Sequence, residues 1–385
     1  MVRVTVFGGW FGSGNVGDDA ILTGLVNLLT SLDPDVEVVA LSTDPAQTRR
    51  VCGVEAIRLL SPRGFIRGDK NALRAYRRAF KDADACIVTG GTPIYDYGHL
   101  SRCIHFKLPG AFGRKLFLLG VGVKRIKSRL GKEVTRALVG GAELVSTRDE
   151  ASRGELLRLG VGRPVRVTGD SGLFMEPSDP SIGLGLLQER GVDTSGRMVA
   201  VCPRELSEDF RVHYHERLTR RAICNIRRNV AGVVDCLVES GCEVVFVPMH
   251  CSPQDDDLRE IEAIRRLMRN RDAGAVLGEV LPREAMSVLG VMDLVLGLRL
   301  HSLILAGAQG VPVVGIGHDP KIRGFMEGAG VEGFLCHPLY PFECVLERVE
   351  SALEDGATVE RRLLESCEGM KERIRDEARR VLASI

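Results

Sequence analysis

Several features are scarce or absent in this 385-residue chain, and each absence excludes a class of protein. Aromatic residues make up only 5% of the sequence, too few for the stacking surface that single-stranded nucleic acids need. Lys and Arg total 52 against 51 Asp and Glu, so no overall positive charge attracts nucleic acid or a membrane. No Cys-x-x-Cys, P-loop or Gly-x-Ser-x-Gly motif occurs. We therefore expect no nucleic-acid partner and no resident metal or cofactor.

An uninterrupted membrane-spanning run is also missing. Residues 300–317 come nearest, but His301, Gln309 and Pro312 interrupt them, which predicts a short buried helix and then a strand. The first residues, MVRVTVFGGW, predict a strand and lack the parts of a signal peptide. The 11 cysteines are scattered, as is typical of reduced thiols in an intracellular protein. These features predict a cytoplasmic protein.

One local cluster of charge leaves a second location open. Residues 217–228 contain five arginines. Such a stretch is usually a solvated helix face, and contact with a glycan or with the inner face of an anionic membrane is the alternative.

What the sequence does contain is an alternation of apolar strands with helical patterns along nearly the whole chain. Continuous apolar strands separated by helices predict parallel sheets that are covered on both faces. The strands are predicted at 2–7, 36–41, 85–89, 116–121, 144–147 and 165–167, then at 198–202, 244–247, 274–277, 294–296 and 311–316.

The alternation breaks at residues 175–193, where prolines and glycines predict a linker. We therefore expect an α/β protein of two doubly wound Rossmann-like domains, 1–176 and 177–385, facing a cleft, with ligands at the carboxyl ends of the strands. The chain ends in a predicted helix from 359 to 385. Its packing face is marked by apolar residues three or four apart, namely Cys367, Met370, Ile374, Ala378 and Val381.

The glycine-rich loop after the first strand is the first candidate site. Gly12, Gly14 and Gly17 match a dinucleotide-binding pattern, but four residues separate Gly12 from the strand, and Asp18 follows where a pyrophosphate would sit. Asn15 and Asp18 instead suit the hydroxyls of a sugar. Asp18 acts either as a helix cap alone or as a cap that also binds a ligand, and both interpretations stay open.

The second candidate site follows the strand at 294–296. Arg299 and His301 open a helix there, and backbone N–H groups with a guanidinium and an imidazole suit a phosphate or a carboxylate. The alternative is that Arg299 forms an interdomain salt bridge and that His301 is a satisfied, half-buried side chain. Lys321 follows the next strand and adds a charge at the same edge, and Arg204 leaves the strand at 198–202.

Two histidine-containing segments hint at a metal. These are His213-x-His215 and His250, which precedes the acidic run 255–257. Their spacing matches no recognised ligand set, which favours solvated polar surface.

With these residues in view, the sequence resembles the polysaccharide pyruvyl transferase family. The matching pieces occur in family order: residues 12–22 (GSGNVGDDAIL), Gly90-Gly91, residues 148–152 (RDEAS), Asp170, residues 292–304 (MDLVLGLRLHSLI) and Asp319-Pro320-Lys321. The first piece and the Arg-Leu-His element together carry most of the specificity.

The resemblance implies a GT-B-like fold and the transfer of pyruvate from phosphoenolpyruvate to a sugar, usually as a cyclic ketal. Phosphoenolpyruvate would be a co-substrate, and the acceptor would be a sugar or a lipid-linked glycan precursor. The resemblance implies that Arg299 and His301 bind the donor, and Arg204 matches a further arginine of the family. With Lys321 at the same edge, these four are the expected donor-binding residues, and the expected acceptor-side residues are Asn15, Gly17, Asp18, Gly90 and Gly91. As catalytic residues the sequence favours His301 as general acid, Arg299 for the donor's charge, and Asp18 as the group that takes the hydroxyl proton.

Three other functions are compatible with parts of the pattern. A glycosyltransferase with a nucleotide-sugar donor would share the architecture and the cationic second domain. A nicotinamide-dependent oxidoreductase would rest on the glycine loop alone, and a glycan-binding relative without catalysis would bind anions without turnover.

Overall fold

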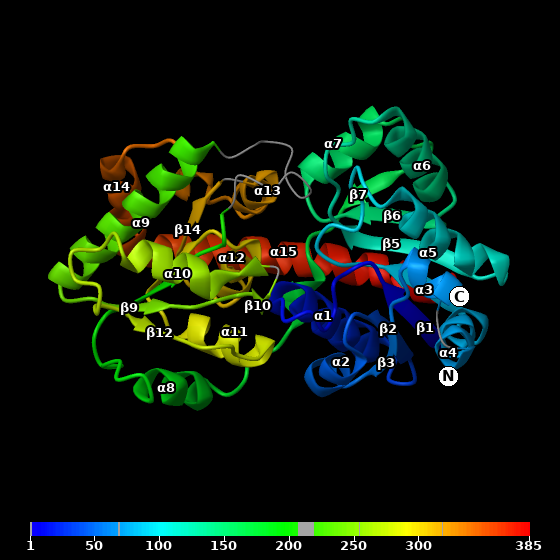
Figure 1. Cartoon of the computed structure of the whole chain (residues 1–385), viewed down its shortest axis with the longest axis horizontal. Coiled ribbons are helices and arrows are strands. Elements are labelled where there is room, and N and C mark those ends of the chain that lie inside the picture. Colours follow the sequence, from blue (N-terminus) through cyan, green and yellow to red (C-terminus); the bar gives the residue numbers. More distant parts are fainter. Residues whose placement is uncertain (1, 68–69, 207–218, 254, 318) are drawn as a thin grey trace. The chain divides into compact units, whose positions relative to one another are not determined.

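The computed structural model describes residues 2–67, 70–206, 219–253, 255–317 and 319–385 (Figure 1). They fall into two compact units, Met1–Met175 together with Met370–Ile385, and Glu176–Gly369. The two units divide one residue before the predicted boundary at 176/177. The last residues, 370–385, group with the first unit, whereas the sequence analysis places them in the second domain.

The first unit is built on a seven-stranded sheet in which every pairing is parallel. The strand order is β3-β2-β1-β4-β5-β6-β7. The strands are β1 Arg3–Phe7, β2 Glu37–Ser42, β3 Glu55–Arg58, β4 Ala85–Val88, β5 Lys115–Val121, β6 Leu144–Thr147 and β7 Val165–Val167.

Helices connect these strands and cover the sheet. They are α1 Val16–Leu32, α2 Pro45–Cys52, α3 Pro62–Arg67, α4 Lys70–Lys81, α5 His99–Ala111, α6 Arg129–Gly140, α7 Glu150–Arg158 and the 3-10 helix η1 Ser171–Phe174. Apolar side chains of α4, α5, α6 and α7 share one buried cluster with the strands, so these helices cover one face. Phe7, Tyr76, Phe80 and Phe106 contribute its largest aromatic contacts.

The second unit contains a six-stranded parallel sheet and a small antiparallel hairpin. The sheet order is β12-β9-β8-β13-β14-β15. Its strands are β8 Met198–Cys202, β9 Glu243–Phe246, β12 Ala275–Val276, β13 Leu294–Gly297, β14 Val313–Ile316 and β15 Leu335–Cys336, and the hairpin pairs β10 Cys251–Ser252 with β11 Asp255–Asp256.

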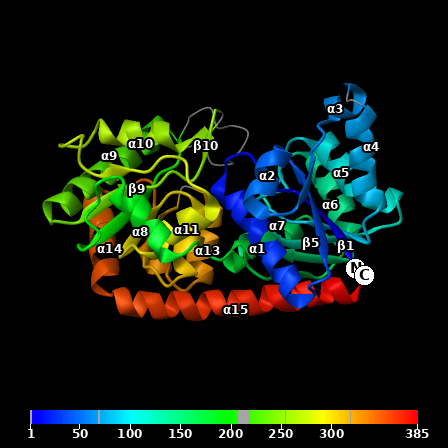
Figure 2. The same ribbon diagram turned by 90° about the horizontal axis from the view of Figure 1, so that it is seen from below.

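Its helices are α8 Pro180–Gln188, α9 Arg220–Glu239, α10 Asp257–Arg265, α11 Pro282–Gly290, α12 Leu300–Gly307, α13 Pro320–Gly328, the 3-10 helix η2 Glu332–Phe334 and α14 Phe342–Glu354. The last helix, α15 Gly356–Ala383, begins in the second unit and ends in the first. Figure 2 shows α15 as one long helix at the end of the chain. The predicted packing face of this helix is confirmed, since Cys367, Met370, Ile374, Ala378 and Val381 are all buried.

The predicted α/β class with two parallel sheets is confirmed, and the differences are local. The segment 175–193 is no plain linker, because it contains α8. Asp179 caps that helix by accepting a hydrogen bond from Ser181 N, and Pro180 occupies its first turn, where a missing N–H costs nothing. The short strands β3 and β15 were not predicted.

Candidate active site

Each sheet has one point where the direction of strand addition reverses. In the first unit β1 lies between β2 and β4, and in the second unit β8 lies between β9 and β13. Loops at the carboxyl ends of such neighbouring strands diverge to opposite faces and leave room for a ligand. The sequence-predicted residues lie at these two points, with Gly12–Asp19 and Gly90-Gly91 after β1 and β4, and Arg204 and Arg299 after β8 and β13.

The glycine loop of the first unit is held closed by Asp19. The carboxylate of Asp19 accepts a hydrogen bond from Gly12 N at 2.8 Å, and Gly12 has a φ of 73°, which favours glycine. Burial raises the pKa of Asp19 to about 7, the Gly12 hydrogen bond lowers it, and the neighbouring charge of Asp18 raises it further. The aspartate that closes the loop therefore titrates near neutral pH.

Asn15 and Asp18 are brought together with the turn after β4. Asn15 caps α1 by accepting a hydrogen bond from Gly17 N at 2.9 Å, and its amide donates to Asp18 Oδ2 at 3.0 Å. Gly91 N donates to Asp18 Oδ1 at 3.2 Å. The expectation that Asp18 caps this helix is wrong, because Asn15 is the N-cap; Asp18 instead ties the start of α1 to the Gly90-Gly91 turn.

Gly90 is required at this turn for two reasons. Its φ is 118°, and a Cβ there would lie 2.5 Å from the Cα of Gly9. The turn after β4 therefore packs directly on the loop after β1, which brings the predicted acceptor-side residues to one edge.

The same edge continues through Arg148, Asp149 and Asp170. Arg148 is buried, and its guanidinium lies 3.2 Å from Asp170 Oδ2 and 3.5 Å from Asp149 Oδ2. Asp149 caps α7 and Asp170 caps η1. The family-like residues after β6 and β7 therefore form an internal ion-pair network in the first unit.

In the second unit, Arg299 is clamped by two aspartates. Its Nε donates to Asp257 Oδ2 at 2.9 Å, and Nη1 and Nη2 donate to Asp255 at 3.0 and 2.6 Å. Burial disfavours the charge of Arg299, but Asp257 and Asp255 outweigh burial and leave its pKa above the ordinary value. The interdomain salt bridge considered from the sequence is replaced by one inside the second unit.

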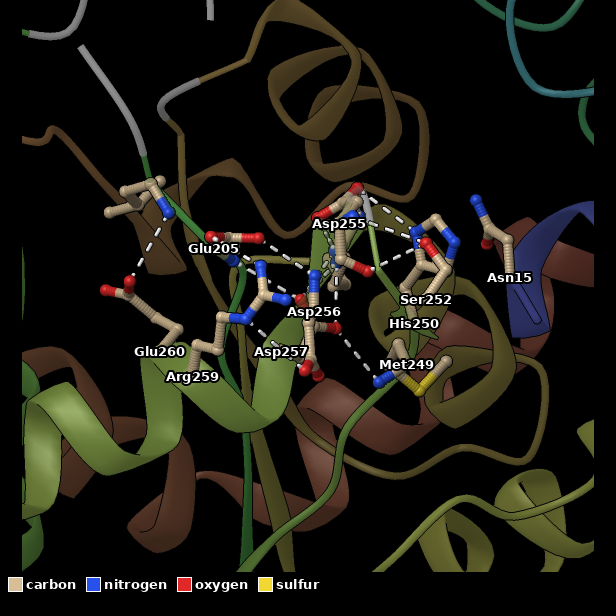
Figure 3. Close-up of polar contacts among 12 residues, drawn as sticks. Asn15, Glu205, Met249, His250, Ser252, Asp255, Asp256, Asp257, Arg259 and Glu260 are labelled. Atoms are coloured by element: carbon tan, nitrogen blue, oxygen red, sulfur yellow. Dashed lines mark hydrogen bonds and ion pairs between the residues drawn. The ribbon is translucent and has the colours of Figure 1, made fainter. Parts of the chain in front are cut away.

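Asp257 joins three strand ends. Besides Arg299 after β13, it accepts hydrogen bonds from Met249 N after β9 at 3.0 Å and from Glu205 N after β8 at 3.3 Å. Figure 3 shows it among Glu205, Met249 and Asp255. Since the Asp257 side chain is fully buried and Asp255 pairs with Arg299, the expectation of a solvated acidic run at 255–257 is wrong.

The environment of His250 differs from the solvated surface predicted for it from the sequence. Its Nδ1 lies 3.1 Å from Asp255 Oδ2, and its Nε2 is buried and forms no hydrogen bond with a described residue (Figure 3). Burial alone would raise the pKa of Asp255, but His250 and Arg299 hold it well below its usual range. The sequence signal that could have indicated this environment is the position of His250 directly after the apolar run 244–249.

The remaining cations lie at the same edge of the second sheet. Arg204 is buried, and its pKa falls to about 10 because of burial and the charge of Arg299, partly offset by Asp255, Asp319 and Asp257. Lys321 Nζ lies 3.6 Å from Asp319 Oδ2, and Asp319 caps α13. His301 is half-buried in the first turn of α12, whose N-cap is Arg299.

Within the described ranges, no group of three or more His, Cys, Asp and Glu side chains is arranged to hold a metal ion. His213 and His215 lie outside those ranges. Among the described helices, none combines the length and the apolar character needed to cross a bilayer.

Comparison with solved structures defines the class of this protein. It resembles a glycosyltransferase from Rickettsia africae with a TM-score of 0.63 and 11% identity, covering 99% of this chain and 98% of that one. A UDP-GlcNAc 2-epimerase from Neisseria meningitidis gives 0.58 and 14%, with full coverage of both chains (100% each). The ADP-heptose heptosyltransferase II of E. coli gives 0.54 and 13%, over 92% and 99% of the two chains. The chain therefore has a GT-B-like fold.

Within that class the chain belongs to the polysaccharide pyruvyl transferase family, whose model matches residues 15–320. The match spans the Asn15–Asp19 helix start, the Arg148–Asp170 network and the Arg299–Asp257 clamp. The resemblance drawn from the sequence is thus confirmed at the level of the family.

Proposed function

We propose that this protein transfers pyruvate from phosphoenolpyruvate to a sugar of a polysaccharide or glycan precursor, as a cyclic ketal. The observation that carries the proposal is the family match together with cations from three strand ends of the second sheet, Arg204, Arg299 and Lys321. Phosphoenolpyruvate carries a carboxylate and a phosphate, and both groups call for positive partners.

At the donor end, the clamp on Arg299 has a clear role. Four oxygens of Asp255 and Asp257 already engage this side chain, so Arg299 is held in place within a charge cluster and offers a ligand no free fork. Arg204 and Lys321 supply further positive charge at this edge. Burial and the charge of Arg299 lower the pKa of Arg204, and a bound anion would add to the offset that Asp255, Asp319 and Asp257 provide, which favours binding at this point.

In the proposed reaction, His301 delivers a proton to the methylene carbon of phosphoenolpyruvate, which becomes a methyl group. The oxygen of one sugar hydroxyl bonds to the central carbon and gives up its proton to Asp18. The bond between the central carbon and the phosphate oxygen then breaks, and a second hydroxyl adds to that carbon and gives its proton to the departing inorganic phosphate. Atoms balance once the proton on Asp18 returns to His301 through solvent, because the two hydroxyl hydrogens are then accounted for by the methyl group and by phosphate.

At the acceptor end, Asn15, Asp18 and the Gly90-Gly91 turn offer hydrogen-bonding groups of the kind that sugar hydroxyls match. Asp18 accepts one hydrogen bond at each oxygen from the protein, which leaves further lone pairs for a hydroxyl. Gly17 lies in the first turn of α1 beneath this group.

The test is phosphate release from phosphoenolpyruvate in the presence of a panel of free, nucleotide-linked and lipid-linked sugars. The proposal predicts release that requires both substrates, and a product with the methyl signal of a pyruvate ketal by NMR. His301→Ala should lower kcat far more than phosphoenolpyruvate affinity, because it removes a proton donor; an equal loss of both would make His301 a binding residue. No release with any acceptor, despite folded protein, contradicts the proposal.

The second candidate function is glycosyl transfer from a nucleotide-sugar, which the fold of the solved relatives favours. Thermal stabilisation by UDP, GDP or CMP, with none by phosphoenolpyruvate, would support it. Stabilisation by phosphoenolpyruvate without turnover would instead support a glycan-binding protein without catalysis.

A further inference from the structure

The positive charge of this chain is concentrated in one part of the first unit. Residues 58–132 contain seventeen Lys and Arg, four Asp and no Glu, although the whole chain carries 52 basic and 51 acidic residues. The remainder of the protein is therefore acidic. The net charge of the whole chain is near zero only because acidic residues elsewhere offset this strongly basic region.

This region folds onto one face of the first sheet. The helices α3, α4, α5 and α6 are neighbours there, since α5 contacts each of the other three. Figures 1 and 2 both show them side by side. Because their apolar sides are buried in one cluster with the strands, their basic sides are directed outward.

Helix α4 shows the pattern most clearly. Its inner side carries Tyr76 and Phe80, which are buried. Its outer side carries exposed lysines and arginines, namely Lys70, Arg74, Arg77, Arg78 and Lys81. None of these five pairs with an acidic side chain in the part of the chain that the structure describes. Elsewhere, exposed arginines such as Arg266 and Arg361 form ion pairs with glutamates on their own helices.

The segment that leads into α6 repeats this composition. Residues 124–132 contain five Lys and Arg and no acidic residue. Two exposed leucines open helices of the same region, Leu130 beside Arg129 in the first turn of α6 and Leu100 in the first turn of α5, with 62% and 65% of their surfaces exposed. An exposed leucine contributes no hydrophobic stabilisation to the fold, because its apolar surface stays in contact with water.

We propose that this basic face of α3–α6 docks on the surface of an anionic phospholipid bilayer. Lipid headgroups match the exposed cations of α4 that pair with no acidic side chain of the described residues, and the interfacial region takes up Leu100 and Leu130. A nucleic acid matches the same charge but gains little from two leucines. Because the apolar side of α4 belongs to the core, the protein binds peripherally and inserts no helix.

This inference does not rest on the proposed function, and either can fail alone. A near-zero net charge of the chain does not exclude this binding, because the electrostatic field near one face is set by the charges within a Debye length of about 8–10 Å. The proposal also moves the expected membrane contact from the arginines at 217–228 to the first unit.

The experiment is sedimentation of the full-length protein with vesicles of phosphatidylcholine alone or mixed with phosphatidylglycerol, at low and high salt. We expect binding only to the anionic vesicles and its loss at high salt. Each cation near an anionic surface strengthens binding about five-fold, so R77Q/R78Q should weaken it about 25-fold. The matched control is R221Q/R228Q, two exposed arginines of α9 in the second unit, with the same change in net charge.

L100S/L130S separates the apolar part of the contact. It should weaken vesicle binding several-fold and leave the slope of binding against salt unchanged, because no charge is removed. Circular dichroism and thermal unfolding confirm that each variant is folded.

Two results would overturn the proposal. One is equal binding to neutral and anionic vesicles, or equal loss in R77Q/R78Q and R221Q/R228Q. The other is binding to a single-stranded oligonucleotide that R77Q/R78Q abolishes, with no binding to vesicles, which would assign the face to nucleic acid.

Discussion

Aspartates at the carboxyl edges of the two sheets have pKa values that are shifted in opposite directions. In the first unit, Asp19 accepts a backbone hydrogen bond and bonds to no basic side chain of the described ranges, so burial raises its pKa to about 7. In the second unit, Asp255 is also largely buried, but Arg299 and His250 hold its pKa far below the usual range. Around the switch point of the first sheet, backbone groups and a near-neutral carboxyl prevail, and the ion pairs of Arg148 lie further along that edge; around the switch point of the second sheet, ion-paired side chains prevail.

This difference shows how one architecture, used twice in a chain, can serve two kinds of ligand. The strand order around each switch point is similar, so the backbone alone does not distinguish the edges. The loops do: glycines and caps after β1 and β4 suit a hydroxylated ligand, and arginines after β8 and β13 suit an anion. The following predictions test the contrast, beginning with the largest loss of stability at a fixed pH and ending with a change that is measured per pH unit.

The first prediction concerns the ion pairs of Arg299 with Asp255 and Asp257 in the second unit. Asp257→Asn should lower the free energy of unfolding by about 3 kcal/mol, because it removes one charge of a buried ion pair that joins three strand ends. Denaturant unfolding measures the effect. The control is Asp256→Asn, half-buried and adjacent, where Asn still caps α10. Similar stabilities of the two variants would show that the ion pairs of Arg299 do not stabilise this edge of the sheet.

The second concerns the backbone of the first edge. Gly90→Ala should destabilise by about 2–3 kcal/mol, because the new Cβ would meet the backbone of Gly9 at 2.5 Å. Gly53→Ala is the matched control: its φ is also positive, at 69°, but no atom lies within 4 Å of the added Cβ. It should cost only about 1 kcal/mol. If the two costs were equal, the close approach of the two loops would contribute nothing.

The third uses the raised pKa of Asp19. The folded state binds this proton more tightly than the unfolded state does, so its contribution to stability is complete below about pH 4 and is lost as pH rises toward 7. Asp19→Asn removes the titration and keeps an acceptor for Gly12 N. The difference in unfolding free energy between wild type and variant should therefore change by about 1.4 kcal/mol per pH unit in that window. A constant difference across pH 4–7 would contradict the buried, near-neutral state of Asp19.

Much of the fold followed from the sequence, because apolar strand runs and helix caps are local signals. The strands at both switch points were predicted, and with them the places of Asn15, Asp18, Arg204 and Arg299. The strand β3 was missed because it lies at the sheet edge, where EAIR carries two charged residues and no apolar run. Helix α8 was missed because Pro180 was interpreted as a break and not as a first-turn residue.

The partners of Arg299 were beyond sequence reasoning for a different reason. Asp255 and Asp257 lie more than forty residues earlier, and only the parallel order of β9, β8 and β13 brings them to Arg299. An acidic run beside a histidine resembles a metal site or a solvated loop until that order is known. The basic face of α3–α6 was missed because acidic residues elsewhere offset its charge, so the net charge of the chain does not reveal it.

Calorimetric titration of phosphoenolpyruvate into the wild-type protein and into Arg204→Gln is the most direct test of the donor assignment. The account predicts binding by the wild type, at least ten-fold weaker binding by Arg204→Gln, and no change in Arg228→Gln, an exposed arginine of the same unit. Arg204→Lys, which keeps the charge, should recover part of the affinity. Binding of a nucleotide in place of phosphoenolpyruvate, or equal affinity in wild type and Arg204→Gln, would contradict it.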